Sequence, residues 1–238
     1  MKGRHYWFSS AWIVLLTLIV SCGMEVFIYL YPVIYRDFDP TSDPTYNYFS
    51  FRTSDERNMD EAGDFFKGFE IYYRLYNNST VAASDRSAIN TKNTDTPTQA
   101  YTYLINTKRY VRLLCDSRGN TVPLLPAASS NRKISVRLVP YVDQVPSIVI
   151  SDLYDQPMEQ FGTPRRSVVE TFTSQASLFE FDEIGEGDLD VYWSSTWDDV
   201  NDKKWYMQAY VMAYGYDSSY KPLYSELFYL GMITISER

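Results

Sequence analysis

The chain has 238 residues, a formal net charge of −8 and 22 tyrosines. Nucleic-acid binding needs a basic face that neutralises phosphates, so this acidic composition excludes that class of partner. The high aromatic content excludes a disordered chain, because disordered segments are poor in aromatic residues.

The first 22 residues have the pattern of an export signal. Lys2 and Arg4 form a positive head, and a largely apolar run follows over residues 11–20. The small residue Ser21 then precedes Cys22. A positive head, an apolar middle and a small-residue cleavage site together indicate secretion.

The end of this segment, Leu18-Ile19-Val20-Ser21-Cys22, resembles the lipobox of bacterial lipoproteins, with Ile19 at the position where Leu is usual. The resemblance implies that residues 1–21 are a signal peptide and that Cys22 carries a thioether-linked lipid. It also implies a membrane-anchored protein of the bacterial cell envelope. In this family an Asp after the cysteine retains the protein at the inner membrane, so Gly23 favours the outer membrane over the periplasmic face of the inner one.

Two alternatives to the lipobox stay open. The segment Trp7–Met24 could remain as a transmembrane anchor, since about 18 apolar residues can span a bilayer. Cys22 could also be an incidental cysteine in an ordinary cleaved signal. All three interpretations place the domain outside the cytoplasm.

The signal assignment limits the chemistry of the mature chain. The only histidine is His5, so the chain after the signal has none. This excludes Ser-His-Asp and Cys-His catalysis and histidine-ligated metals. With Cys22 lipidated, Cys115 has no disulfide partner and is expected to pack in the core as a small apolar residue. We therefore expect a protein that is not an enzyme and has no cofactor and no metal.

Residues 22–238 are predicted to form a single β-rich domain. Strands are predicted over 25–35, 46–53 and 66–78. The third of these alternates, with two faces of different character. One face carries Phe69, Ile71, Tyr73 and Leu75, and the other carries Glu70, Tyr72, Arg74 and Tyr76.

Residues 77–100 are almost wholly polar and predict a long loop. Further strands are predicted over 100–115, where a helical turn is the alternative, and over 133–143, 147–154 and 167–184. In the second of these, Ser135 and Arg137 share the polar face.

An acidic loop is predicted over residues 182–204, with Trp193 and Trp197 among its carboxylates. The runs 203–217 and 223–235 then predict a closing hairpin. No helix of several turns is expected after the signal. Many strands separated by turns favour an antiparallel β-sandwich.

Three stretches resemble strands of the fibronectin type III family. Residues 68–76 resemble its third strand, 209–215 its sixth and 227–235 its closing strand. The resemblance implies an immunoglobulin-like sandwich. The chain departs from it in size, since such modules have about 100 residues, and in having Met207 where the family's corner tyrosine would fall. We therefore expect one sandwich elaborated by large loop insertions.

The acidic loop is the main candidate for chemistry. Asp188 and Asp190 could contribute to a calcium site, because calcium prefers clustered carboxylate oxygens. They could also be a carboxylate pair for glycoside hydrolysis, with Trp193 or Trp197 as the sugar platform. The interpretation we favour is a solvated loop, since runs of charge usually lie on solvated surfaces.

The sequence therefore predicts a lipid-anchored, non-catalytic binding or structural module with an unknown protein or glycan partner. The alternative is an exported carbohydrate-active or calcium-dependent glycan-binding protein that uses residues 182–204. The tyrosines on the polar strand faces are expected to be covered rather than to form a binding surface.

Overall fold

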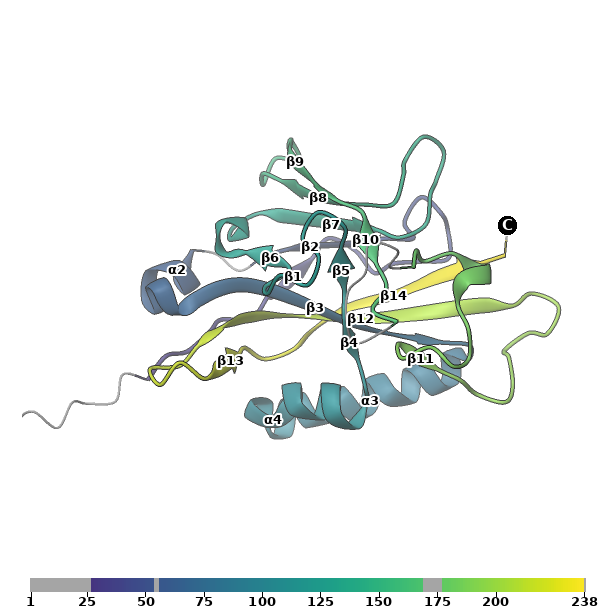
Figure 1. The fold of residues 1–238 in the computed structure, drawn as a ribbon, viewed down its shortest axis with the longest axis horizontal. Coiled ribbons are helices and arrows are strands. Elements are labelled where there is room, and N and C mark those ends of the chain that lie inside the picture. Colours follow the sequence, from purple (N-terminus) through teal and green to yellow (C-terminus); the bar gives the residue numbers. More distant parts are fainter. Residues whose placement is uncertain (1–26, 54–55, 169–176, 238) are drawn as a thin grey trace, which may run out of the picture.

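The computed structural model describes residues 27–53, 56–168 and 177–237. The predicted signal segment 1–21 and Cys22 lie outside these residues. Within the described ranges, no helix combines the length and apolar character needed to cross a membrane. The described chain forms three layers: a five-stranded sheet, a seven-stranded sheet and a layer of helices (Figure 1).

The seven-stranded sheet is the middle layer. Its two long strands, β3 (Phe66–Tyr76) and β12 (Lys204–Tyr216), pair antiparallel from Gly215–Phe66 to Tyr206–Tyr76. The remaining strands pair with one of these two. They are β4 (Val111–Arg112), β6 (Leu125–Pro126) and the parallel β11 (Val191–Tyr192) on β3, and β13 (Pro222–Tyr224) and β14 (Phe228–Ser236) on β12.

The five-stranded sheet lies on one face of the middle layer. It has the order β1-β2-β7-β8-β9, with every neighbouring pair antiparallel. Its strands are β1 (Tyr35–Arg36), β2 (Phe49–Arg52), β7 (Lys133–Arg137), β8 (Ser147–Ser151) and β9 (Pro157–Gly162). A separate pair joins β5 (Leu114–Cys115) to β10 (Pro164–Arg165).

The main core fills the space between the two sheets. Strand alternation places Phe69, Ile71, Tyr73 and Leu75 of β3 in this core, opposite apolar residues of β2, β7 and β8. The predicted faces of residues 69–76 are confirmed. Cys115 is also fully buried in this core, as its apolar neighbours predicted.

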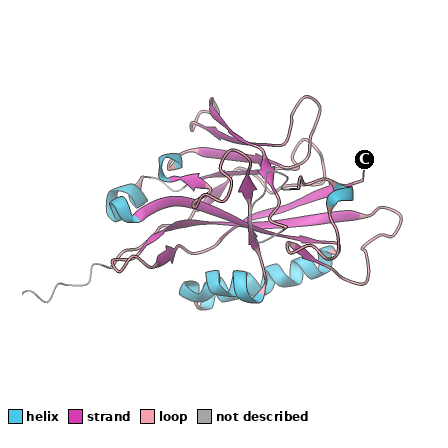
Figure 2. Cartoon of the chain, viewed as in Figure 1, coloured by secondary structure: helices cyan, strands magenta, loops and turns pink. Residues whose placement is uncertain are grey.

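The second face of the middle layer is covered by helices, which corrects the sequence prediction. Residues 77–100 were expected as a polar loop, but they contain α3 (Ser79–Asp95) and the first residues of α4 (Pro97–Thr102). A π-helical turn continues α4 over Tyr103–Thr107, in the run 100–115, where strands were expected and a helical turn was the alternative. Figure 2 shows these helices along one side of the sheet.

Helix α3 forms in spite of its polar sequence because its first turn is capped and one narrow stripe of its side chains is buried. The side chain of Asn78 accepts a hydrogen bond from the Val81 N–H and caps the first turn. Ala82, Asp85 and Ile89 form the buried stripe, at i, i+3 and i+7. Their neighbours in the second core are tyrosines of the sheet, so packing rather than helix propensity supports the helix.

Other elements differ in detail from the prediction. Of the strand expected over 25–35, the structure describes residues 27–35, and among these only Tyr35 joins a sheet. The described residues before it follow an irregular path held in part by the Asn58 side chain, which bonds both backbone groups of Tyr31. Part of the strand-like run 167–184 lies outside the described residues. Its end forms a single 3₁₀ turn, Phe181–Glu183. Short helices α2 (Arg57–Ala62), Gly63–Phe65 and Ala127–Ser129 complete the described elements.

The predicted closing hairpin is confirmed. Strand β12 pairs with β14 in an antiparallel register that runs from Lys204–Ser236 to Val211–Phe228. The short strand β13 extends the pairing at the far end of β12.

Candidate functional site

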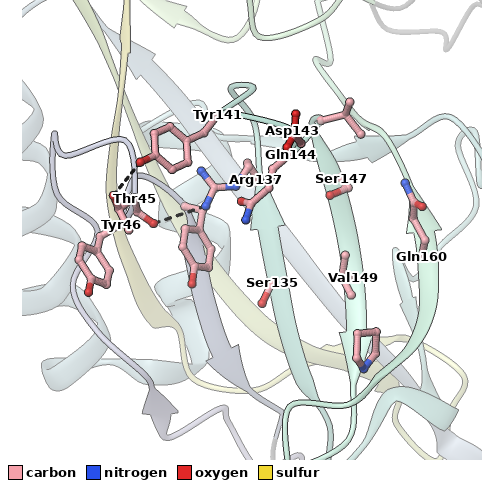
Figure 3. A pocket seen from close by; sticks show the side chains of 13 residues that line it. Thr45, Tyr46, Ser135, Arg137, Tyr141, Asp143, Gln144, Ser147, Val149 and Gln160 are labelled. Carbon is pink, nitrogen blue, oxygen red and sulfur yellow. Dashed lines mark hydrogen bonds between the residues drawn. The ribbon is translucent and has the colours of Figure 1, made fainter.

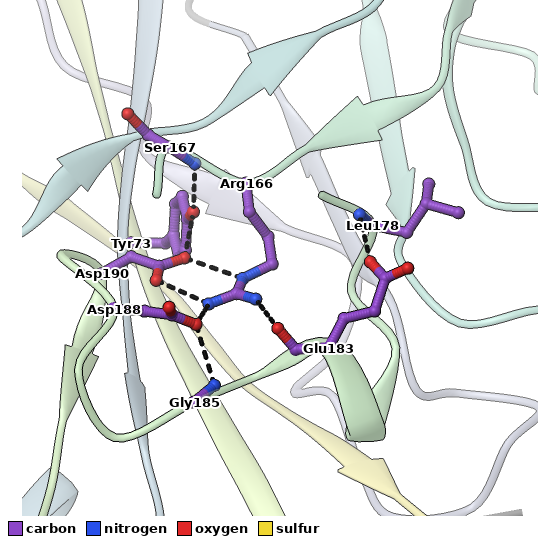
Figure 4. A network of polar contacts seen from close by, with 8 residues as sticks. All are labelled: Tyr73, Arg166, Ser167, Leu178, Glu183, Gly185, Asp188 and Asp190. Atoms are coloured by element: carbon purple, nitrogen blue, oxygen red, sulfur yellow. Dashed lines mark hydrogen bonds and ion pairs between the residues drawn. The ribbon is translucent and has the colours of Figure 1, made fainter. Parts of the chain in front are cut away.

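The two aspartates singled out in the acidic loop bind one buried arginine (Figure 4). Nε of Arg166 lies 3.0 Å from Oδ2 of Asp190, and Nη2 lies 2.8 Å from Oδ1. The same Nη2 donates to Oδ2 of Asp188 at 2.6 Å. Arg166 and Asp190 have side chains that are 0% exposed, whereas Asp188 is 29% exposed.

The rest of this network supplies the remaining hydrogen bonds. Nη1 of Arg166 donates to the carbonyl of Glu183 at 2.6 Å, and the hydroxyl of Tyr73 donates to Asp190 at 2.6 Å. The Gly185 N–H donates to Asp188 at 2.8 Å. Burial raises the pKa of the Asp190 carboxyl, and the hydrogen bonds and charge of Arg166 oppose that rise. A carboxylate so fully engaged fastens the acidic loop to the core.

Within the described residues, no three or more His, Cys, Asp or Glu side chains are grouped so that they could hold a metal ion. Asp188 and Asp190 meet at Arg166 instead. The sequence prediction singled out the two carboxylates but not their cation, because Arg166 lies 22 and 24 positions earlier in the chain.

Trp193 and Trp197 lie in an aromatic cluster with Trp205 of β12. The ring of Trp197 makes edge contacts with Trp193 and Trp205, with centroids 5.5 and 5.0 Å apart. Trp193 is 39% exposed, and Trp197 packs against the main core. The cluster therefore fastens one end of β12, and only part of the Trp193 ring faces solvent.

The loop that carries these tryptophans is attached to the start of α3. Asn77 exchanges two hydrogen bonds with Ser194, both 2.8 Å long. The carboxylate of Asp198 accepts from the Ser79 N–H at 2.9 Å, at the N-terminus of the helix. Loop and helix thus hold each other in place.

The tyrosine face of the middle sheet is covered, as expected, but by helices instead of loops. Tyr76 donates to Asp85 of α3 at 2.9 Å, and Tyr110 donates to Gln208 of β12 at 2.9 Å. Lys108 pairs with the second oxygen of Asp85 at 2.6 Å. These groups form a satisfied buried network, which orients the helix on the sheet.

A groove of about 640 Å³ lies over the outer face of the five-stranded sheet (Figure 3). Because side chains alternate along a strand, residues outside the core meet on this face. The register places Arg137 beside Ser147, Ser135 beside Val149, and Val149 beside Gln160. The walls come from two loops and carry Tyr46, Tyr48, Tyr141 and Asp143.

Arg137 is the charged centre of this groove. Its guanidinium lies 4.4 Å from the centre of the Tyr48 ring and 5.8 Å from that of Tyr141. Nη1 donates to the Pro44 carbonyl at 3.1 Å, and Nη2 donates to the Thr45 carbonyl at 3.5 Å. Burial lowers the pKa of the guanidinium, while the two tyrosines oppose that change. The side chain is thereby fixed between two aromatic rings.

Arg137 forms no ion pair within the part of the chain that the structure describes. Sequence alternation had placed Arg137 and Ser135 on a polar face. Tyr141 lies close to Arg137 in the chain, but the strand pattern did not show that the two side chains are in contact. Tyr46 and Tyr48 could not be linked to Arg137 from sequence, because they belong to a segment about 90 positions earlier. Comparison with protein-family models, with curated proteins and with solved structures found no match.

Proposed function

We propose that this protein is a lipid-anchored, non-catalytic binding module of a bacterial cell envelope, held at a membrane outside the cytoplasm by acyl chains on Cys22. The observation that carries the proposal is the stretch Leu18–Cys22 after a positive head and an apolar run. One acyl chain gives marginal membrane binding, whereas two or more on one cysteine anchor a protein stably.

The Arg137 groove supports the binding part of this proposal. It combines aromatic walls with a few polar groups, which is the usual composition of a small-molecule site. The groove is a better candidate for the binding site than the acidic loop, because the carboxylate oxygens of Asp188 and Asp190 in that loop already bind Arg166. A carbohydrate-active site that used Asp188 and Asp190 would have to break that network.

We also propose that the two sheets are a divergent immunoglobulin-like sandwich. The pairing of β12 with β3 on one side and β14 on the other supports this proposal, because the sixth strand of such a fold pairs with the third and the seventh. The other sheet differs. Here β7 lies next to β2, and β8, which follows β7 in the chain, lies on the far side of β7. In the immunoglobulin order the fifth strand, which follows the fourth in the chain, is the one that lies next to the second.

The anchor is tested by Cys22→Ala in the full chain, expressed in a bacterium fed a labelled fatty acid. The variant should leave the membrane fraction or remain as an unprocessed precursor, and it should carry no label. Cys115→Ala is the matched control, because it removes the other cysteine, which is buried. Label on the Cys22→Ala variant would refute lipidation at this residue. Unlabelled wild-type protein in the membrane fraction would favour an uncleaved transmembrane anchor.

A further inference from the structure

We propose that the Arg137 groove binds a small hydroxylated monocarboxylate, of which a uronic acid is the simplest representative. This names a ligand class for the binding module proposed above, although binding in the groove does not itself require the lipid. The inference rests on three features of the groove: an arginine without a carboxylate partner among the described residues, polar side chains without hydrogen bonds to those residues, and aromatic walls.

The first feature is the charge of Arg137. Arg166, also buried, has two carboxylate partners, whereas no described carboxylate lies within ion-pair distance of Arg137. A guanidinium has five N–H donors, and the two backbone carbonyls take up two of those on Arg137. Figure 3 shows its guanidinium inside the groove, between Tyr141 and the strands. An entering carboxylate would supply the missing charge and accept the remaining donors.

The second feature is a set of hydrogen-bonding groups around that charge. The side chains of Ser135, Ser147 and Gln160 line the groove from three adjacent strands, and none bonds to another described residue. They can donate to and accept from hydroxyl groups. Asp143 in the wall can accept from a further hydroxyl. The groove therefore fits a ligand with several hydroxyls better than a plain apolar acid.

The third feature limits the ligand's charge and shape. A single guanidinium matches a single negative charge, and Asp143 would repel a dianion. Carboxylate is therefore favoured over phosphate, which carries about 1.5 to 2 negative charges at neutral pH. The aromatic side chains of Tyr46 and Tyr141 line the groove and supply apolar surface for the C–H side of a sugar ring.

The test is calorimetric titration of the full chain, purified from membranes in detergent, with D-glucuronate, D-glucose and inorganic phosphate. We expect D-glucuronate to bind with a Kd of about 1 mM or tighter and the other two at least about tenfold more weakly. Arg137→Lys should weaken D-glucuronate binding about tenfold, because lysine keeps the charge but loses the planar fork.

A second variant separates loss of binding from loss of folding. Ser147→Tyr places a ring in the groove without removing any contact of Arg137, and it should abolish D-glucuronate binding. Ser84→Tyr, the same change at an exposed position of α3, should bind like the wild type. Thermal unfolding of both variants should remain close to that of the wild type.

Absence of D-glucuronate binding by the wild type would overturn the proposal, as would equal binding by Ser147→Tyr. Tighter binding of phosphate than of D-glucuronate would overturn the assignment of a monocarboxylate. None of these results bears on the anchor, which stands or falls with the labelling of Cys22.

Discussion

Arg166 and Asp190 form a bidentate ion pair in the interior, with N–O distances of 3.0 and 2.8 Å and no exposed side-chain surface on either partner. Removing the Asp190 carboxylate would leave the buried Arg166 guanidinium with only the partly exposed Asp188 as a carboxylate partner. We predict that Asp190→Asn lowers the free energy of unfolding by about 3 kcal/mol or more. Urea denaturation followed by tryptophan fluorescence measures this.

Asp188→Asn is the matched control for that prediction. Asp188 is partly exposed and meets only one nitrogen of the guanidinium, so water can replace part of its contribution. The loss should be about 1 kcal/mol. Equal losses in the two variants would contradict the buried role assigned to Asp190.

Glu70 of β3 should give the protein a stability that depends on pH. Burial raises the pKa of its carboxyl from 4.5 to about 7, although Arg112, whose Nε donates to it at 3.0 Å, opposes the rise. Between these two values the folded chain holds a proton that the unfolded chain has lost. The free energy of unfolding should therefore fall as pH rises from 4.5 to about 7, by a few kcal/mol.

Glu70→Gln isolates this contribution, because glutamine does not titrate. The difference in unfolding free energy between wild type and variant should shift against the wild type as pH rises through that window. Urea denaturation at a series of pH values measures it. A difference that stays constant from pH 4.5 to 7 would show that Glu70 titrates alike in both states.

Gly68 is required by the close approach of two strands. Its φ is +142°, and a Cβ at this position would overlap the carbonyl oxygen of Leu125 in β6. Gly68→Ala should lower the free energy of unfolding by about 2 kcal/mol or more, from backbone strain and the displaced strand. Gly187→Ala, where a Cβ meets nothing within 4 Å, should change it by less than about 0.5 kcal/mol. Chemical denaturation of both variants decides between a local steric requirement and a general cost of the substitution.

The cap of α3 should be measurable in the same way. Asn78→Ala removes the acceptor of the Val81 N–H and should cost about 1 kcal/mol. Asn78→Asp preserves an acceptor at the helix N-terminus and should restore most of that loss. If both variants lost the same amount, the side chain would be acting through a contact other than the cap.

The strands that the sequence predicted correctly are those in which residues facing the core alternate with residues facing away from it. Residues 69–75 alternate between a core face and a second face, and Ile134 and Val136 do the same around Ser135. Period-two patterns of this kind need no knowledge of the partner strand. These patterns were sufficient to predict a β-rich fold and the closing hairpin.

Helix α3 was not predicted because many of the residues that stabilise it lie in other, distant segments of the chain. Only Ala82 and Ile89 supply apolar burial along its stripe, and its Ser, Thr and Asn residues are weak helix formers. The tyrosines that stabilise it belong to β3 and β12. The spacing of Ala82, Asp85 and Ile89 after Asn78, followed by Pro97 at the start of the next helix, was the available signal.

The candidate site was beyond sequence reasoning for a related reason. Arg137 is one polar residue on a strand face until the fold brings Tyr48, from a segment about 90 positions earlier, against its guanidinium. Likewise, Asp190 pairs with Arg166 because the fold brings them together, and no sequence spacing indicates this pair. Long-range pairings of single side chains leave no periodic trace in the chain.

The length of β12 separates the tryptophan cluster from the end of the domain that lies nearest the proposed anchor. Its 13 residues span about 40 Å. Trp205 and its two tryptophan neighbours lie at one end, and the turn after Tyr216 lies beside Phe27 at the other. Only five peptide steps separate Phe27 from Cys22, a reach of at most about 18 Å. If the anchored domain stands with β12 pointing away from the bilayer, brominated lipids should leave the tryptophan emission unquenched, and quenching would show that the domain lies flat on the membrane.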